Sequence, residues 1–267
     1  MAVSIAPLHS LVSAVMEGVG APHLLIPAGR SPHHASLKPS VMRQLHQADL
    51  LVTIDHACLE IALGKAAAKK RAEQQLNVSE ISGIKRLRYH PEQHQHGDCD
   101  YDAHLWLDPV NAITIVHAVA ARLSWLDPAH DAVYRRNCAD TVQRLQQLHN
   151  TLRQQFLTPM KAYMVYHNAY AYFEQRYALK PVFVVLKNPE IQPGIKRIRE
   201  VRRRLVQANV QCLFTEPQFP SKLIRAISSG THLQVVTLDP LGYRLPLGTT
   251  LYFTLLENMA SGFAQCL

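Results

Sequence analysis

Fifteen histidines occur among the 267 residues, and the placement of several suggests metal chemistry. One short polar run interleaves histidines with aspartates: His90, His94, His96, Asp98, Asp100, Asp102 and His104. Neutral imidazole is the commonest protein ligand for transition metals, and carboxylates are its usual companions. The chain is therefore predicted to handle a divalent metal, with zinc favoured.

Further candidate ligands lie where strands are expected to end. His33 lies in a loop after an apolar run, His167 ends the run that begins at Tyr163, and Asp239 ends the last such run. His104 lies just before a helix expected to begin at Pro109. Ligands of parallel α/β sheets gather at the carboxyl ends of strands. Three histidines and one carboxylate would complete a four-coordinate zinc site, although any one such histidine, taken alone, is more often an ordinary surface or core residue than a ligand.

The elements that must position these residues alternate between strands and helices, the pattern of an α/β fold. Strands are expected at 3–5, 23–26, 50–54, 163–166, 182–186, 210–214 and 233–238. Helices are expected at 8–19, 40–46, 169–176, 194–207, 221–229 and 251–263.

A long helix is expected in the middle of the chain, because no Gly or Pro interrupts the segment between Pro128 and Pro159. Its apolar stripe recurs at steps of three and four: Tyr134, Cys138, Val142, Leu145, Leu148, Leu152 and Phe156. Such a helix would be about 40 Å long. The fold is predicted to be two α/β lobes, 1–127 and 159–267, each with a mostly parallel four-stranded sheet and flanking helices, joined by one rigid spine helix at 128–158.

Composition and charge exclude several classes. The hydrophobic content of 48% suits a globular protein with a core. The net charge is +8, and the densest basic cluster, 196–204, has apolar residues at helical spacing, so it is predicted to be one solvated face of a helix and not a nucleic-acid site. Docking of that cluster on an acidic partner stays open. No apolar stretch approaches the roughly 20 residues that span a bilayer.

The five cysteines show no CxxC spacing, which argues against a thiolate zinc site. Cys212 lies in an apolar run and Cys266 is the penultimate residue, so a bond between them would hold a tail that otherwise frays. The alternative is five reduced thiols.

Six segments resemble, in the same order, those of the high-affinity zinc-uptake periplasmic binding proteins, which are solute receptors of ABC importers for zinc or manganese. They are 31–40 followed by 47–50, then 102–109, 166–174, 188–194, 215–219 and 237–242. The resemblance extends from about Val3 to Cys266, which makes it far more specific than one short motif.

The resemblance implies two α/β lobes on a rigid spine helix with the metal clasped between them. It implies His33, His104 and His167 as ligands, with Asp239 or water in the fourth position. Some relatives carry Glu before the first ligand, but this chain has Pro32 there. The manganese branch has a carboxylate in place of His167, and nitrogen-rich ligation favours Zn2+ over Mn2+.

The resemblance also implies an accessory loop, a disulfide and a location. The run 90–99 resembles a shortened histidine-rich loop, in which His90, His94 and His96 form either a weak accessory zinc site or only a solvated loop. Cys212 and Cys266 match a disulfide pair of proteobacterial relatives, which indicates an oxidising periplasm. We expect that a signal peptide, absent from 1–10, has been removed.

The expected function is a zinc receptor, not an enzyme, that delivers Zn2+ to the permease of an ABC importer. Its expected partners are that permease and, through the permease, the ATPase of the importer. We expect a monomer that binds no nucleic acid and meets the inner membrane only through the permease. Two other functions stay open: a zinc-dependent hydrolase, with Glu216 as the best available base, and an extracytoplasmic metal buffer or chaperone. Zinc affinity should fall as the pH drops below about 6.5, because imidazoles must be neutral to bind metal. The spine predicts little closure of the lobes on binding.

Overall fold

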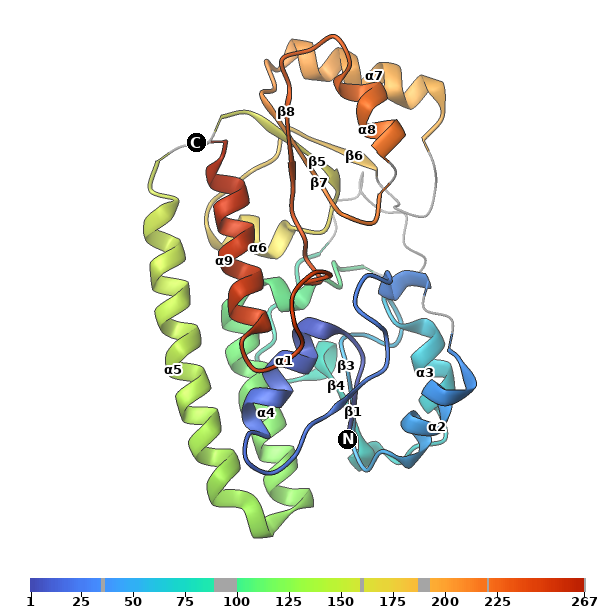
Figure 1. Ribbon diagram of the computed structural model, residues 1–267, viewed down its shortest axis with the longest axis vertical. Coiled ribbons are helices and arrows are strands. Elements are labelled where there is room, and N and C mark those ends of the chain that lie inside the picture. The colour runs from blue at the N-terminus through green and yellow to red at the C-terminus, as the bar shows by residue number, and fades with distance from the viewer. Residues whose placement is uncertain (35–36, 89–99, 159–160, 187–192, 220, 267) are drawn as a thin grey trace.

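The computed structural model describes residues 1–267 except 35–36, 89–99, 159–160, 187–192, 220 and 267. Its described strands form two parallel four-stranded sheets, one in each lobe (Figure 1). The first has the order β2 (His23–Leu24), β1 (Ala2–Val3), β3 (Leu51–Thr53) and β4 (Gln75–Asn77). The second has the order β6 (Phe183–Leu186), β5 (Tyr163–His167), β7 (Cys212–Thr215) and β8 (Gln234–Thr237). The predicted fold class is confirmed.

One strand of the first sheet, β4, was not among those expected from the sequence. Among the described strands it pairs only with β3, at the edge of the sheet, and just Leu76 of its three residues is buried. A single apolar residue between two polar ones is too short to show the alternation by which a half-buried strand is recognised.

The long helix α5 (Asp131–Gln155) runs along one side of the molecule from the first lobe to the second (Figure 1). It follows α4 (Pro109–Leu126) after a short 3₁₀ turn at Pro128–His130, and the two helices pack side by side. The Oδ1 atom of Asp108 accepts a hydrogen bond of 2.9 Å from the amide of Val110 and so caps the start of α4. The expected spine is therefore an α-helix from 131 onward, preceded by this turn.

The last helix, α9 (Leu251–Ala264), forms a second connection between the lobes. It packs against α1 (Ala6–Val15) of the first lobe and against α5. The amide of Tyr252 donates a hydrogen bond of 3.0 Å to the hydroxyl of Ser10. Since one hydrophobic core runs from the first sheet through α9 into the second lobe, the division of the chain at 127 and 159 stays a prediction.

The remaining α-helices flank the sheets: α2 (Pro39–Gln47), α3 (Ile61–Ala67), α6 (Ala171–Arg176), α7 (Ile195–Gln207) and α8 (Ser221–Ser228). In α7, Val201 and Leu205 are buried while Lys196, Arg199 and Arg203 are exposed, as its sequence pattern predicts. Among the described residues, no helix combines the length and the apolar character that crossing a bilayer requires.

Candidate metal centre

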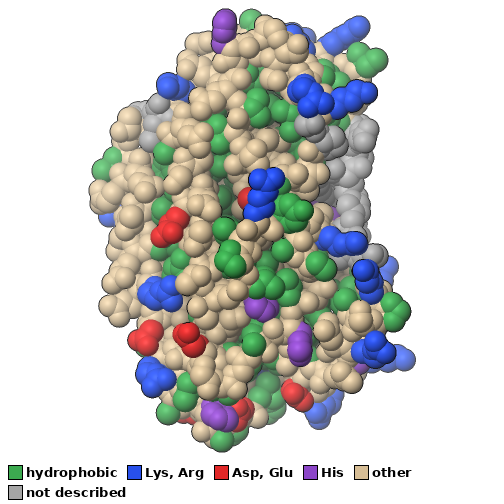
Figure 2. Space-filling view, in the orientation of Figure 1, with side chains coloured by type: hydrophobic (Ala, Val, Ile, Leu, Met, Phe, Trp, Pro, Cys, Tyr) green, Lys and Arg blue, Asp and Glu red, His purple; other side chains and the backbone are tan. Residues whose placement is uncertain are grey.

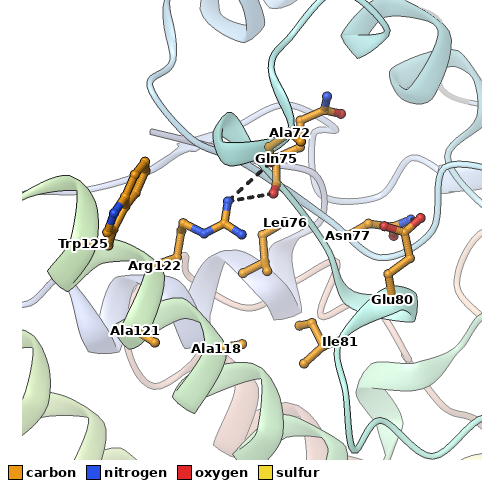
Figure 3. Close-up of a pocket in the computed structure, with 10 residues that line it drawn as sticks. All are labelled: Ala72, Gln75, Leu76, Asn77, Glu80, Ile81, Ala118, Ala121, Arg122 and Trp125. Carbon is orange, nitrogen blue, oxygen red and sulfur yellow. Dashed lines mark hydrogen bonds between the residues drawn. The ribbon is translucent and has the colours of Figure 1, made fainter.

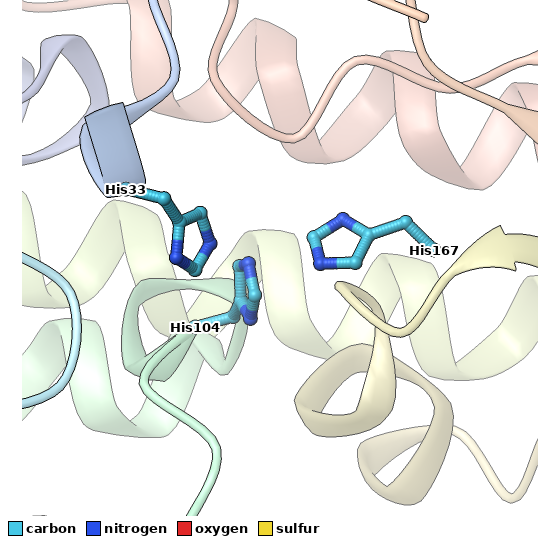
Figure 4. Close-up of side chains that lie close together, drawn as sticks. All are labelled: His33, His104 and His167. Carbon is cyan, nitrogen blue, oxygen red and sulfur yellow. The ribbon is translucent and has the colours of Figure 1, made fainter. Parts of the chain in front are cut away.

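Three histidines that are far apart in the sequence meet between the lobes. The possible ligand atoms of His33, His104 and His167 all lie within 4.8 Å of one another. Their ring centroids are 5.8 Å (His33–His104), 6.0 Å (His33–His167) and 5.2 Å (His104–His167) apart. The rings converge on a common point (Figure 4), and nitrogens this close to one another suit shared coordination of one ion.

Each histidine reaches this point from a different element. His167 is the last residue of β5, and His104 directly precedes the 3₁₀ turn Leu105–Leu107. His33 lies in the 3₁₀ turn Pro32–His34, beyond the end of β2. Parallel strands place their carboxyl ends at one edge of a sheet. Here the edges of the two sheets face each other, so the loops of both lobes contribute histidines to the centre.

Two buried carboxylates orient two of the imidazoles. The Nδ1 atom of His104 donates to Oδ1 of Asp102 at 2.6 Å, and Nδ1 of His167 donates to Oε1 of Glu216 at 2.9 Å. A carboxylate can only accept, so each ring carries its proton on Nδ1 and its lone pair on Nε2. Carboxylates that hold histidine ligands in this way are usual in metal sites.

The surroundings of the Nε2 atom of His167 fit a metal ion. The atom is buried, and within the described part of the chain it has no hydrogen-bond partner. Leaving a buried nitrogen unpaired is costly. A metal ion at the point where the rings converge would satisfy it, because Nε2 carries the lone pair.

Sequence reasoning did not identify the role of either carboxylate. Asp102 belonged to the polar run, and its separation of two residues from His104 was the only available signal. Glu216 was considered only as the base of a hydrolase. The structure places its Oε1 on His167 and its Oε2 within 2.5 Å of the Gln218 amide nitrogen. Both oxygens are therefore engaged in hydrogen bonds.

Asp239, the fourth expected ligand, lies just beyond β8. Its Oδ1 accepts a hydrogen bond of 3.1 Å from the amide of Leu241, and burial raises the pKa of its carboxyl above the usual range. The group of converging ligand atoms among the described residues consists of the three histidines, without a carboxylate. The role of Asp239 thus stays a prediction.

The other expected site residues are a pair of cysteines and a group of three histidines. Cys212 and Cys266 form the disulfide that the resemblance implied, and it ties the end of α9 to β7. His90, His94 and His96 lie outside the described residues.

A cavity next to the centre lies on the side of α3. His104 and His167 are 5% and 4% exposed, whereas His33 is less deeply buried. His33 lines this cavity of about 260 Å³ together with Pro32, Glu60 and Lys65. We call this side of the molecule the mouth of the site.

A larger cavity of about 480 Å³ lies away from the histidines, between α4 and β4 (Figure 3). It is lined by Arg122, which donates to the carbonyls of Glu73 at 2.6 Å and Gln75 at 3.1 Å. Its lining residues include neither His nor Cys. With Glu80 as the one carboxylate in its lining, it lacks the set of donors that a zinc site needs.

Two solved structures share the two-lobed arrangement of this chain over nearly its whole length. A crystal structure of ZnuA matches with a TM-score of 0.83 and 23% identity, covering 99% of this chain and 97% of its own. The SBP FpvC from Pseudomonas aeruginosa, in complex with Mn2+, matches with a TM-score of 0.85 and 19% identity, covering 99% and 96%. This chain therefore has the two-lobed fold of the solute-binding proteins.

Sequence comparison identifies the family. The family model described as zinc-uptake complex component A, periplasmic, matches residues 1–266. The high-affinity zinc uptake system protein ZnuA of Brucella abortus (strain 2308) is 31% identical over 304 residues, covering 99% of this chain and 90% of that protein. Its counterpart in Haemophilus ducreyi is 33% identical over 285 residues, covering 99% and 92%. The chain belongs to this family of periplasmic zinc-uptake solute-binding proteins of ABC importers, which are receptors and not enzymes.

Proposed function

We propose that this protein captures Zn2+ between its lobes through His33, His104 and His167 and delivers it to the permease of an ABC importer. The observation that carries the proposal is the convergence of three imidazoles, two of them held by buried carboxylates so that Nε2 points to the common centre. Neutral imidazoles bind zinc without further protein charge.

Selectivity for Zn2+ over Mn2+ follows from the donor set. Manganese prefers carboxylate and other oxygen ligands, whereas an all-nitrogen protein set suits zinc. Asp239 is the residue that would make the site more suitable for manganese. Because the group of converging ligand atoms contains no Asp239 oxygen, water is the simpler fourth ligand, and Asp239→Asn decides between them. Unchanged zinc affinity assigns the position to water, and a loss on the order of 100-fold assigns it to Asp239.

The ligand set is tested by competition titration of zinc against a chelating dye. His104→Ala and His167→Ala should each weaken zinc binding on the order of 100-fold, because each removes one of three protein ligands. His46→Ala, an exposed histidine on α2, is the matched control and should bind as the unchanged protein does. If either ligand variant retains its affinity, that residue is not a ligand.

Delivery is tested with the permease and its ATPase reconstituted in liposomes. The zinc-loaded protein should stimulate ATP hydrolysis and zinc uptake, and the His167→Ala variant should not. A protein that binds zinc tightly but supports no uptake would instead be a metal buffer. The hydrolase alternative is less favoured, since hydrogen bonds hold the Glu216 carboxylate against His167 and Gln218.

A further inference from the structure

The positive charge of this protein is concentrated in two stretches of sequence. Residues 30–71 contain seven Lys and Arg against three Asp and Glu, and residues 194–232 contain eight against two. The rest of the chain contains 13 against 15. The net charge of +8 therefore comes entirely from these two stretches.

The two stretches lie on the same side of the molecule. The first forms α2 and α3 of one lobe, and the second forms α7 and α8 of the other, all across the molecule from α5 (Figure 1). Lys and Arg side chains gather along this margin, whereas on the side of α5 they alternate with Asp and Glu (Figure 2). This margin includes the mouth of the metal site.

On α7 the basic residues serve two different purposes. Arg197 donates to the carbonyls of Val184 and Val185, and Arg202 donates to three carbonyls at the end of α8, so both hold the lobe together. Lys196, Arg199 and Arg203 are exposed and, among the described residues, form no ion pair. Their spacing of three and four residues places them on one face of the helix. We call these three residues the upper patch.

The first lobe carries an equivalent group. Lys38, Arg43, Lys65 and Lys69 are exposed and take part in no ion pair within the described chain. Lys65 lines the same cavity as His33, so this group reaches the mouth. We call these four residues the lower patch.

Positive charge beside the mouth does not favour the approach of Zn2+. It repels an approaching divalent cation and lowers the local concentration of that ion, the reverse of electrostatic steering. Solvated, unpaired cations also contribute little to folding. The arrangement is physically favourable toward a negatively charged surface that covers the mouth.

We propose that the upper and lower patches dock the protein onto an acidic surface of the permease, with one lobe on each side of the permease entrance. The inference rests on the proposed function. A permease with acidic areas flanking its entrance matches two patches separated by the mouth, whereas a flat anionic membrane would place lipid headgroups over the mouth itself. Once docked, the acidic partner also offers the released Zn2+ a favourable environment.

The experiment measures docking to the importer complex in nanodiscs of neutral phosphatidylcholine. Two variants reverse one patch each: Lys196→Glu, Arg199→Glu and Arg203→Glu for the upper patch, and Lys38→Glu, Arg43→Glu and Lys69→Glu for the lower. The matched control reverses three exposed cations at the spine side, Arg136→Glu, Arg153→Glu and Lys180→Glu. Zinc affinity is measured for every variant and should not fall, since none of the replaced residues is a proposed ligand and the added negative charge does not repel Zn2+.

Each patch variant should dock about tenfold more weakly or worse at low salt, and the difference should shrink as salt rises, because exposed charges are screened. The spine-side control should dock normally. Equal docking by all variants overturns the inference while leaving zinc delivery intact. Binding to phosphatidylglycerol vesicles is measured in parallel. If the patch variants lose only this binding and dock normally to the importer, the patches belong to a membrane contact and the inference is overturned. Failure of the unchanged protein to dock at all would instead overturn the proposed function.

Discussion

At the scale of single residues, the metal centre depends on which nitrogen of each imidazole is available. Asp102 and Glu216 fix the protons of His104 and His167 on Nδ1, and thereby direct Nε2 toward the centre. The same hydrogen bonds prevent the rings from turning. In the proposed zinc site these two donors would therefore be preorganised, which would lower the entropic cost of binding.

We expect Glu216→Gln to weaken zinc binding about tenfold. The amide can still accept from His167, but it no longer supplies the charge that makes the imidazole a stronger donor to the metal. The measurement is competition titration, with circular dichroism to verify folding. Glu200→Gln on α7 serves as the remote control. Zinc affinity equal to that of the unchanged protein would show that Glu216 only fills space.

Glu174 makes stability depend on pH. Burial raises its pKa to about 8, and it accepts a hydrogen bond of 3.0 Å from the hydroxyl of Tyr163. A carboxyl whose pKa is higher in the folded state favours folding fully below its unfolded pKa of about 4.5, and this contribution is lost as the pH rises toward 8. Urea unfolding of the metal-free protein should therefore show lower stability at pH 8 than at pH 5.

In Glu174→Gln this decline should be smaller by roughly 2 to 4 kcal/mol, since the amide does not ionise. Tyr163 retains an acceptor in the variant, so the comparison isolates the charge. A decline of the same size in both proteins would mean that Glu174 does not carry it.

At the scale of elements, α9 connects the two lobes and the disulfide anchors its end. The helix packs on α1 and α5, and Cys266 binds it to Cys212 of β7 across 54 residues of sequence. Closing a loop of that length restricts the unfolded chain far more than the folded one.

Replacement of Cys212 and Cys266 by Ser should lower the free energy of unfolding by about 2 to 4 kcal/mol. Zinc affinity should persist under native conditions, because no ligand lies on α9 or β7. Thermal unfolding with and without reductant measures the effect. A reductant effect of equal size in the double variant would contradict the assignment, because that protein has lost this disulfide.

At the scale of the whole molecule, polar contacts join the two lobes beside the metal centre. The indole of Trp106 donates to the carbonyl of Pro240 at 2.8 Å, and Arg176 forms a bidentate pair with Asp108 at 2.9 and 2.6 Å. The hydroxyl of Tyr172 donates to the carbonyl of Asp102 at 2.7 Å. With α5 and the shared core, these contacts oppose hinge motion between the lobes.

Zinc binding should therefore change the overall shape very little. We expect the radius of gyration from small-angle X-ray scattering to differ by less than about 1 Å between metal-free and zinc-loaded protein, with any movement confined to loops near His33 and His104. A larger contraction on binding would indicate closure of the lobes and would contradict a rigid spine.

Local patterns in the sequence were enough to predict the α/β class, most strands and α5, because the period of apolar residues follows from which face of an element is buried. They failed for β4, which has a single buried residue. They indicated metal binding, but the conspicuous histidines His90, His94 and His96 could be ranked below the others only through the resemblance to a family.

The meeting of His33, His104 and His167 was decided by the tertiary structure alone. These residues are 71 and 63 positions apart, and no local period relates them. Their convergence depends on how α5, α9 and the contacts between the lobes hold the carboxyl edges of the two sheets opposite each other. The tertiary structure also decides that Asp102 pairs with His104 and that Glu216 pairs with His167, because each pair requires two side chains to be buried together. The sequence by itself determined the donors and the elements, whereas the distances and the directions of the lone pairs exist only once the lobes are packed.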